Sequence, residues 1–380
     1  MYLYKSHRGT WAEIDLEAVH DNIAAIKAKL SDGVGIIGVV KADAYGHGAV
    51  QIAQELMREG MEYLAISNID EAIELRNAGI SCPLIILGPI EPAEFGKILE
   101  FNIFPTVSSL EYARELAEVY RYRGVFAKIH VKVDTGMGRL GIPLETAASE
   151  IEQISKLGCF IIDGVFSHFP SSDIDAEYSA DQTGRFLDLA NELKRTGIKI
   201  KHFHIANSAG IFNVPASIAP PFTMVRPGLA IYGYSTLEGL KMRNSMTMKS
   251  RIITIRRMKK GDSVSYMRTY RVGNDFEEIA ILPVGYADGL PTVYSGKGKV
   301  AINGQFYPQV GRICMDYTMV SLGDNRNGVK SGDEAILFGN GGITVEEFGT
   351  QTGRIPYEVT CDISKRVPRI YLRKEDNRNV

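Results

Sequence analysis

Short apolar runs alternate with amphipathic stretches of helical period between about residues 34 and 230. The apolar runs cover residues 34–40, 63–67, 84–88, 103–107, 126–134, 160–168, 201–207 and 223–228. Segments between them, such as HGAVQIAQELMREG and NIDEAIELRNAG, carry apolar residues three and four positions apart and end with glycine. This rhythm predicts eight parallel strands with intervening helices, closed into a (β/α)8 barrel of the TIM type, and leaves an open doubly wound sheet as the alternative.

The sequence pattern changes after about residue 240, where short runs of β-branched residues are separated by turns rich in Gly, Asp and Asn. This pattern predicts a mostly β second domain, so we expect a barrel domain over residues 1–240 and a C-terminal domain over residues 241–380. The basic stretch at 249–260 alternates charged and apolar residues, which favours a strand with one solvated face over a nucleic-acid patch.

Charge and composition narrow the class of ligand. The formal net charge is −2 over 380 residues, which provides no long-range field for nucleic acid or acidic lipid. The N-terminus lacks the pattern of a signal peptide, and no run of about twenty apolar residues occurs. The four cysteines are far apart in the sequence and indicate neither a metal site nor a disulfide framework. We therefore expect a cytoplasmic protein with a local site for a small molecule.

Polar residues follow several of the apolar runs, where the carboxyl ends of barrel strands would meet. Lys41 comes directly after the first run, and the later strand ends carry Arg139, His168, Asn207, Ser208 and Arg226. A lone lysine at a strand end is usually a solvated charge, but these groups would share one mouth if the barrel closes. A desolvated lysine among cations has a lowered pKa and serves as a nucleophile or proton acceptor.

Two stretches near the last strands predict an anion site. HIANSAG begins a short helix after the seventh run, and RPGLAIYG follows the eighth. In barrels, loops at these places present backbone N–H groups to phosphate, where Ser208 would add its hydroxyl and Gly228 would permit close approach. Ordinary capping and turn chemistry is the alternative.

A different motif points to a dinucleotide. Residues 136–141, GMGRLG, fit the G-x-G-x-x-G pattern, and Asp163 lies farther along the chain, as in NAD-dependent oxidoreductases. The motif follows four earlier strand-helix units instead of opening a fold, and its Arg139 suits a carboxylate, so this interpretation is less favoured.

Nine stretches occur in an order that resembles the bacterial alanine racemases. They are VVKADAYGHG (39–48), VDTGMGRLG (133–141), SHF (167–169), ANSAG (206–210), VRPGLAIYG (225–233), VSYMRTY (264–270), GYADG (285–289), GRICMD (311–316) and RIPYEVTCDISKRVPRIY (354–371). The resemblance covers nearly the whole chain. It implies a barrel joined to a β domain, pyridoxal 5'-phosphate as cofactor, alanine as substrate, and a homodimer whose two active sites each draw on both subunits.

The resemblance also implies a role for individual residues. Lys41 would hold the cofactor and act as one base, and Tyr266, from the other subunit, would be the second base. Arg226 would face the pyridine nitrogen, with His168 near the ring. Tyr45, Asn207, Ser208, Gly228, Leu229 and Tyr357 would complete the cofactor site. Arg139 and the backbone of the partner's Met315 would hold the substrate carboxylate, and Lys132 matches a lysine that is carbamylated in many relatives.

Two departures and two alternatives remain open. Asp43 stands where many relatives have Asn, and Met267 stands where glycine is common, which adds bulk beside Tyr266. The alternatives are a racemase with a wider range, acting on serine, lysine or arginine, and a non-catalytic carrier of pyridoxal phosphate. Carriers are generally single barrels, so the second domain favours an enzyme. Among the histidines, His204 is a candidate for supporting Arg226.

Overall fold

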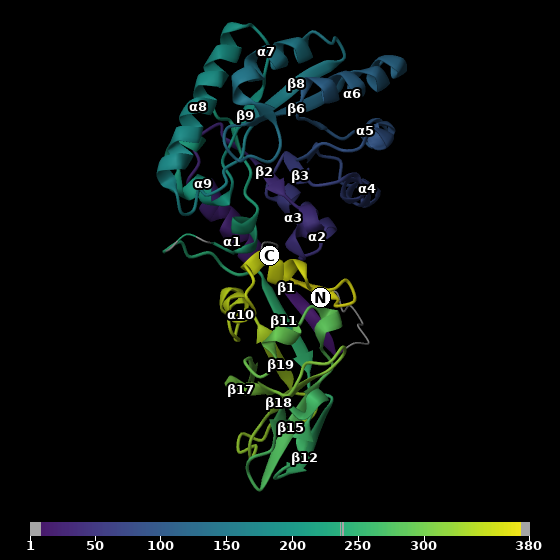
Figure 1. Cartoon of the computed structure of the whole chain (residues 1–380), viewed down its shortest axis with the longest axis vertical. Coiled ribbons are helices and arrows are strands. Elements are labelled where there is room, and N and C mark those ends of the chain that lie inside the picture. The colour runs from purple at the N-terminus through teal and green to yellow at the C-terminus, as the bar shows by residue number, and fades with distance from the viewer. Residues whose placement is uncertain (1–8, 236, 238, 374–380) are drawn as a thin grey trace, which may run out of the picture.

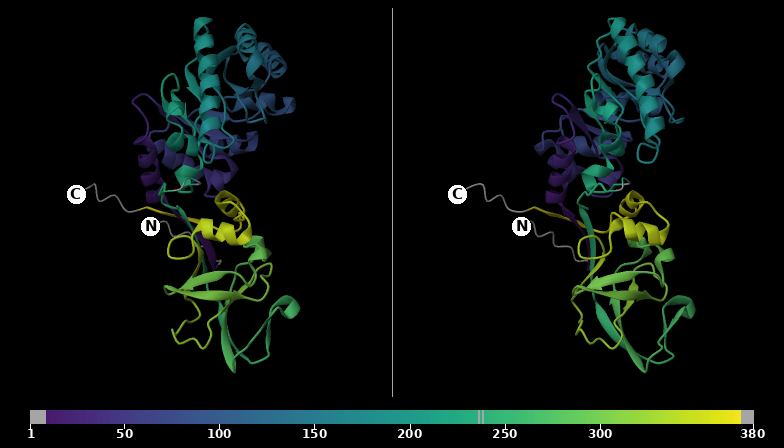
Figure 2. Two further views of the ribbon diagram at one scale, coloured as in Figure 1. Left: turned by 60° about the vertical axis from the view of Figure 1, so that its left-hand side comes forward. Right: turned by 90° about the vertical axis from the view of Figure 1, so that its left-hand side faces the viewer.

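The computed structural model describes residues 9–235, 237 and 239–373. The molecule is elongated, with a helix-covered barrel at one end and a β-rich lobe at the other (Figures 1 and 2). All eight expected barrel strands are present. They are β2 (Gly35–Val39), β3 (Tyr63–Ile66), β4 (Leu84–Ile86), β5 (Thr106–Val107), β6 (Ala127–Asp134), β8 (Phe160–Phe166), β9 (His202–His204) and β10 (Met224–Val225).

Backbone hydrogen bonds close these strands into a ring. Parallel pairing gives the orders β10-β2-β3-β4 and β5-β6-β8-β9, with the short β7 (Ile142–Pro143) beside β6. Phe104 N donates to Leu84 O at 2.8 Å at one junction, and Thr223 N donates to Phe203 O at 3.0 Å at the other. The prediction of a closed barrel is therefore confirmed, and the open doubly wound sheet is wrong.

Amphipathic helices cover the barrel and bury their apolar faces against it. They are α1 (Leu16–Lys27), α3 (Ala49–Arg58), α4 (Ile69–Asn77), α5 (Phe95–Glu100), α6 (Leu110–Arg123), α7 (Leu144–Ser155) and α8 (Ala176–Arg195). The first residues of α4 and α6 are capped by side-chain oxygens of Asn68 and Ser109. Gly60 and Gly79 adopt positive φ just after α3 and α4, as expected for glycines that stop a helix.

The second lobe contains a nine-stranded sheet of order β12-β15-β18-β17-β16-β19-β11-β1-β20. Its strands are β1 (Thr10–Asp15), β11 (Met246–Arg251), β12 (Thr254–Lys259), β15 (Phe276–Leu282), β16 (Lys299–Ile302), β17 (Gln305–Val310), β18 (Thr318–Ser321), β19 (Glu334–Phe338) and β20 (Arg369–Leu372). Strand β1, from the N-terminal segment, pairs with β11 and β20. The boundary near residue 240 stays a prediction. The basic stretch at 249–260 was expected to form one strand, but it forms the end of β11 and all of β12. The chain leaves the strand conformation between them, at Ile252 and Ile253.

Candidate active site

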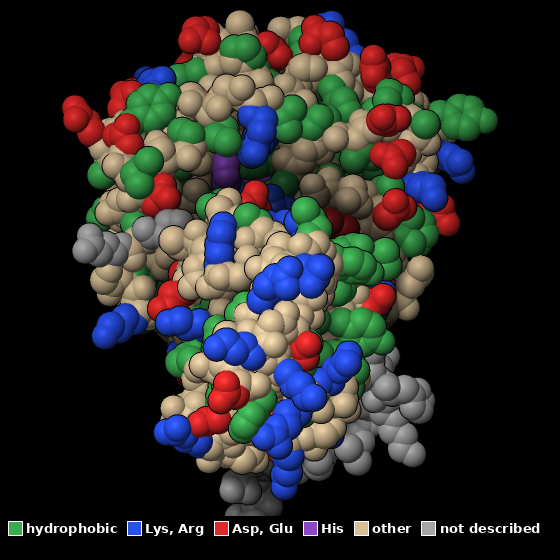
Figure 3. All heavy atoms as spheres, turned by 60° about the horizontal axis from the view of Figure 1, so that its bottom comes forward, with side chains coloured by type: hydrophobic (Ala, Val, Ile, Leu, Met, Phe, Trp, Pro, Cys, Tyr) green, Lys and Arg blue, Asp and Glu red, His purple; other side chains and the backbone are tan. Residues whose placement is uncertain are grey.

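A cavity of about 670 Å³ opens at the carboxyl ends of the barrel strands. The molecular surface is hollowed between the barrel and the β-rich lobe on the face shown in Figure 3. Ten of the residues expected in the site line this cavity together: Lys41, Tyr45, Lys132, Arg139, His168, Asn207, Ser208, Arg226, Gly228 and Leu229. Tyr357, on helix α11 (Pro356–Cys361), joins them from the C-terminal part of the chain.

Lys41 begins the short turn α2 (Lys41–Tyr45), which is wound in the left-handed sense. Four successive residues, Ala42 to Tyr45, have φ between 52° and 55°. This conformation costs roughly 1–2 kcal/mol for each residue other than glycine. Glu71 Oε1 accepts from Ala42 N and Asp43 Oδ1 accepts from Ala49 N, each at 2.8 Å, which holds the turn in place. Asp and Asn both tolerate positive φ, so Asp43 in place of Asn is a small change.

Burial and the charge of Arg139 lower the pKa of the Lys41 amine. Burial, Arg226 and Arg139 lower the pKa of Lys132 to about 8. Both amines therefore lose their protons more easily than an ordinary lysine, and roughly a tenth of Lys132 is neutral at pH 7. Neutral amine is the reactive form for a nucleophile and for carbamate formation.

Arg226 lies at the floor of the cavity and is only 4% exposed. Its Nη2 donates to Ser167 O at 2.5 Å and Ile205 O at 3.2 Å, and its Nη1 donates to His204 Nδ1. The guanidinium also lies over the ring of Phe166, 5.0 Å from the centroid. Burial lowers the pKa of Arg226 to about 9, so the group keeps its charge at neutral pH. His204 thus contacts Arg226 directly, and its role in supporting the guanidinium stays a prediction.

His168 is a neutral base in this environment. Burial and the charges of Arg226, Lys132 and Arg139 hold the pKa of His168 well below its usual value. Its Nδ1 lies 3.4 Å from Arg226 Nη2, which is a donor only, so Nδ1 is the acceptor.

The loops after β9 and β10 form a small cradle. Ser208 begins α9 (Ser208–Asn213), whose N-cap is Asn207, and Ser208 Oγ accepts from Gly228 N at 3.0 Å and Ala230 N at 3.1 Å. A Cβ on Gly228 would meet Tyr45 Oη at 2.4 Å. Glycine is therefore required to bring the tyrosine hydroxyl this close to the backbone. Because Ser208 Oγ accepts from two N–H groups, its O–H is left to donate, and together with the nearby Tyr45 hydroxyl it suits an anion.

The dinucleotide interpretation fails on the geometry of residues 136–141. Asp134 Oδ1 accepts from Gly136 N and Met137 N at 2.8 Å, and Asp134 Oδ2 accepts from Gly138 N at 2.9 Å. The N–H groups that would bind a pyrophosphate are thus already bonded. The motif leads into strand β7 and not directly into a helix, while Asp163 lies inside the barrel wall on β8.

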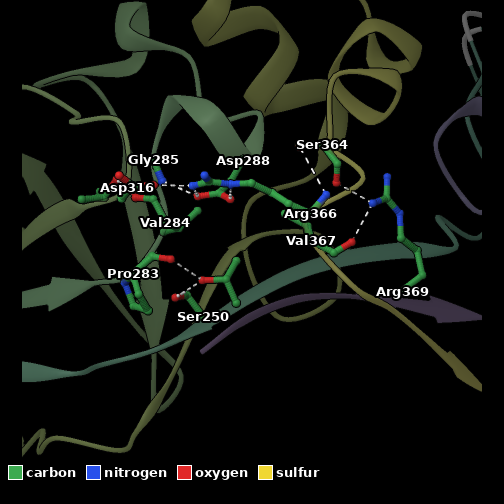
Figure 4. A network of polar contacts seen from close by, with 12 residues as sticks. Ser250, Pro283, Val284, Gly285, Asp288, Asp316, Ser364, Arg366, Val367 and Arg369 are labelled. Carbon is green, nitrogen blue, oxygen red and sulfur yellow. Dashed lines mark hydrogen bonds and ion pairs between the residues drawn. The ribbon is translucent and has the colours of Figure 1, made fainter. Parts of the chain in front are cut away.

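Tyr266 and Met315 lie outside this cavity in the β-rich lobe, Tyr266 at the start of the 3-10 helix η4 (Tyr266–Arg268) and Met315 on a loop. Their exposed fractions are 68% and 52%. Arg366 fixes the Met315 loop from the C-terminal segment: its Nε donates to Asp288 Oδ1 at 2.7 Å and its Nη2 donates to Asp316 Oδ1 at 2.5 Å (Figure 4). Both side chains are exposed in the single chain, where a second subunit could receive them.

Met267 is the residue after Tyr266 and has φ of 59°, within the left-handed region. Glycine adopts this region without cost, whereas a methionine does so at a cost. The Met267 side chain is 77% exposed, so its bulk lies on the surface of the single chain.

Phe166 and Cys361 are among the cavity residues that were not predicted from the sequence. Phe166 ends strand β8, two residues before His168, and its ring also lies under Lys132, with Nζ 5.5 Å from the centroid. Its place at a strand end was the available signal. Cys361 ends helix α11, and only the fold brings that helix beside α2.

Among the described residues, no group of three or more His, Cys, Asp or Glu side chains is arranged to hold a metal ion, and no helix combines the length and hydrophobicity needed to span a bilayer. The fold and the cavity define the class of protein: a barrel enzyme whose strand ends gather a reactive amine, fixed positive charge and an anion cradle around one small-molecule site.

Comparisons with known proteins identify the family. Residues 14–236 match "Alanine racemase, N-terminal domain" and residues 245–371 match "Alanine racemase, C-terminal domain". Alanine racemase 1 of Clostridium acetobutylicum is 42% identical, covering 98% of this chain and 97% of the relative. The alanine racemase of Clostridium tetani is 44% identical with the same coverage of both chains. The chain belongs to the alanine racemase family.

Solved structures agree with this assignment. The alanine racemase of Clostridium difficile 630 superposes with a TM-score of 0.91 at 39% identity and covers 97% of each chain. That of Bacillus anthracis, with bound L-Ala-P, gives a TM-score of 0.87 at 33% identity, covering 97% of this chain and 96% of the other. The predicted architecture, an α/β barrel domain followed by a β-rich domain, is confirmed.

Proposed function

We propose that this enzyme interconverts L-alanine and D-alanine with pyridoxal 5'-phosphate bound at Lys41, and that two such chains form a homodimer with shared active sites. Membership of the alanine racemase family supports the reaction. The observation that carries the assignment to residues is the cavity itself, because it gathers Lys41, Arg226 and the Ser208–Gly228 cradle at one mouth. By the same family relationship, we propose a cytoplasmic enzyme that supplies D-alanine for cell-wall synthesis.

The residues present fit the cofactor. The cradle that a Cβ at Gly228 would fill presents the hydroxyls of Ser208 and Tyr45 beside the start of α9, which suits a phosphate. Leu229 and Tyr357 line the same cavity, and Asn207 caps α9 at the Ser208 turn. The charged Arg226, a donor only, would face the pyridine nitrogen. When bound, pyridoxal phosphate acidifies the α-proton of an attached amino acid by withdrawing electrons.

Two bases on opposite faces move the proton. The Lys41 amine, whose pKa is lowered, accepts or returns the α-proton on one face. Tyr266 of the partner subunit serves the other face. The exposure of Tyr266 in the single chain is consistent with a site that is completed by a second subunit.

The substrate carboxylate would be held by Arg139 and by the backbone of Met315 from the partner subunit. Arg139 is exposed at the mouth of the cavity and has five donors in a fork that suits a carboxylate. The lowered pKa of Lys132 favours its carbamylation, and the resulting negative charge would steady Arg139.

A racemase of wider specificity and a non-catalytic carrier are the competing functions. The assay that separates them measures racemisation of L-alanine, L-serine, L-lysine and L-arginine by the purified protein, with Lys41→Arg as the control that keeps a positive charge. We expect the highest kcat/KM for alanine and loss of activity in Lys41→Arg. Equal rates on alanine and lysine would rule out a dedicated alanine racemase, and an inert protein that binds the cofactor would indicate a carrier.

A further inference from the structure

A line of buried polar side chains crosses the interior of the barrel below Arg226. His204 on β9, His130 on β6, Asp163 on β8 and Tyr63 on β3 are each exposed by 4% or less. The interior of such a barrel is ordinarily packed with branched apolar residues, and an unpaired polar group there is costly. The four residues therefore need a common explanation.

Their polar atoms follow one another at distances of 3.5 Å or less. His204 Nε2 lies 3.1 Å from His130 Nδ1, and the opposite nitrogen of His130, Nε2, lies 3.5 Å from Asp163 Oδ2. The second contact is longer than an ordinary hydrogen bond, but His130 Nε2 has no hydrogen-bond partner among the described residues. The hydroxyl of Tyr63 donates to the same carboxylate oxygen at 3.0 Å.

The backbone is adapted to this chain at two points. A Cβ on Gly164 would lie 2.4 Å from His130 Nδ1 and 3.3 Å from His204 Nε2, so only glycine leaves room for the two rings to meet. The pairing of β6 with β8 also shifts register between Ile129 and His130. A bulge of this kind re-aims a side chain, in this case the His130 ring.

The protonation pattern follows from the contacts. Arg226 Nη1 is a donor only, so His204 Nδ1 is the acceptor, and neutral His204 carries its proton on Nε2. That proton is donated to His130 Nδ1. His130 in turn carries its proton on Nε2, the nitrogen that lies 3.5 Å from Asp163 Oδ2.

The charges along the chain agree with this pattern. Burial lowers the pKa of both histidines, so they are neutral at neutral pH. The pKa of Asp163 is lowered although burial opposes its ionisation, because His130 and Tyr63 stabilise the carboxylate. No carboxylate of the described residues forms an ion pair with Arg226 directly.

We infer that Asp163 is the counter-ion of Arg226, linked to it through His130 and His204. Asp163 and His130 thereby position the guanidinium in the active site. The inference rests on the proposed function for the role of Arg226 in the reaction. Asp163 and His130 are positioning residues, since neither lines the cavity. A carboxylate in direct contact would compete for the guanidinium, whereas the two imidazoles leave Arg226 free to face the cofactor.

The test uses full-length protein labelled with ¹⁵N-histidine and observed by NMR as purified. Bare and protonated imidazole nitrogens resonate at well-separated ¹⁵N shifts, and the signals are assigned from the His204→Gln and His130→Gln variants, each of which loses one set. We expect both rings to be neutral with the proton on Nε2. A proton on His204 Nδ1 would overturn the inference.

The Asp163→Asn variant adds a functional readout. A neutral amide replaces the charged acceptor, so the His130 Nε2–H resonance should move upfield, and kcat should fall about tenfold with KM changing by less than about threefold. Glu55→Gln is the matched control, because Glu55 is a buried carboxylate of the barrel domain that bonds to Arg58 and lies outside the cavity. It should leave both readouts unchanged.

The outcomes separate this inference from the proposed function. If the protein racemises alanine but Asp163→Asn keeps its histidine spectrum and its kcat, the counter-ion role is refuted and the function stands. If the protein has no racemase activity but shows the expected protonation pattern, the proposed function fails, whereas the link from Arg226 through His204 and His130 to Asp163 is supported. If Asp163→Asn does not fold, the spectrum of the unmodified protein still decides.

Discussion

Replacing Gly228 with alanine tests whether the turn after β10 receives the phosphate of the cofactor. The added Cβ would lie 2.4 Å from Tyr45 Oη and 3.0 Å from Tyr45 Cζ. Ordinary contact begins near 3.4 Å, so the hydroxyl must retreat by at least about 1 Å. A hydrogen bond from Tyr45 to the phosphate cannot survive that displacement.

The loss of one hydrogen bond to a charged group is worth roughly 1.5–3 kcal/mol. The dissociation constant of pyridoxal 5'-phosphate should therefore rise by roughly 10- to 150-fold, measured by titrating cofactor into the apo-protein and following its visible absorbance. The free energy of unfolding without cofactor should change much less, because the clash is with a side chain at the edge of an open cavity.

Two further variants control this experiment. Gly184→Ala, on helix α8, adds the same methyl group where no atom lies within 4 Å, and cofactor affinity should not change. Tyr45→Phe removes the hydroxyl itself, so Tyr45→Phe/Gly228→Ala should bind little more weakly than Tyr45→Phe alone. Unaltered affinity in Gly228→Ala, or fully additive losses in the double variant, would refute the reasoning.

Three other predictions follow from the site and its surroundings. Arg226→Lys should lower kcat, and it should lower the free energy of unfolding by about 2 kcal/mol or more in urea denaturation. The reason is that an ammonium cannot reproduce the hydrogen bonds of the planar guanidinium to Ser167 O and Ile205 O. Unchanged values would contradict the role of the guanidinium. His47 is fully buried and its pKa is lowered from 6.5 to about 4, mainly by burial, so its folded form resists protonation. The contribution of neutral His47 to the free energy of unfolding is fully present above about pH 6.5 and is lost as the pH falls towards 4, with about 2 kcal/mol lost at pH 5. The His47→Gln variant should flatten this dependence of the unfolding free energy on pH, measured by urea denaturation. Met267→Gly should raise the unfolding free energy by up to about 1 kcal/mol by relieving the positive φ, and a loss of stability would show that the methionine conformation is not strained.

The periodicity of the chain was sufficient to predict the barrel, since each of the eight apolar runs contains a strand. The runs were longer than the strands: residues 103–107 contain only the two-residue strand β5. Apolar character reports burial, and buried loop residues share it with strands. The pairing of β1 with β11 and β20 depends on contacts between the two ends of the chain, which local patterns do not encode.

The candidate site was predicted where residues end strands, as Lys41, His168 and Arg226 do, because closure of the barrel brings strand ends together. Other features needed three dimensions. His130 and Asp163 lie within strands and had no partner in the sequence, and the left-handed turn after Lys41 contains no glycine until Gly46. The motif at residues 136–141 resembled a dinucleotide site because a sequence pattern does not show that the Asp134 carboxylate accepts hydrogen bonds from the N–H groups of the motif.

The central claim is that Lys41 carries the cofactor. Visible spectroscopy of the purified protein before and after borohydride reduction, followed by peptide mapping, tests it directly. We predict an absorbance band that reduction abolishes and a mass increment on the peptide that contains Lys41. A protein that stays colourless after incubation with pyridoxal 5'-phosphate, or an increment on a different lysine, would contradict the account.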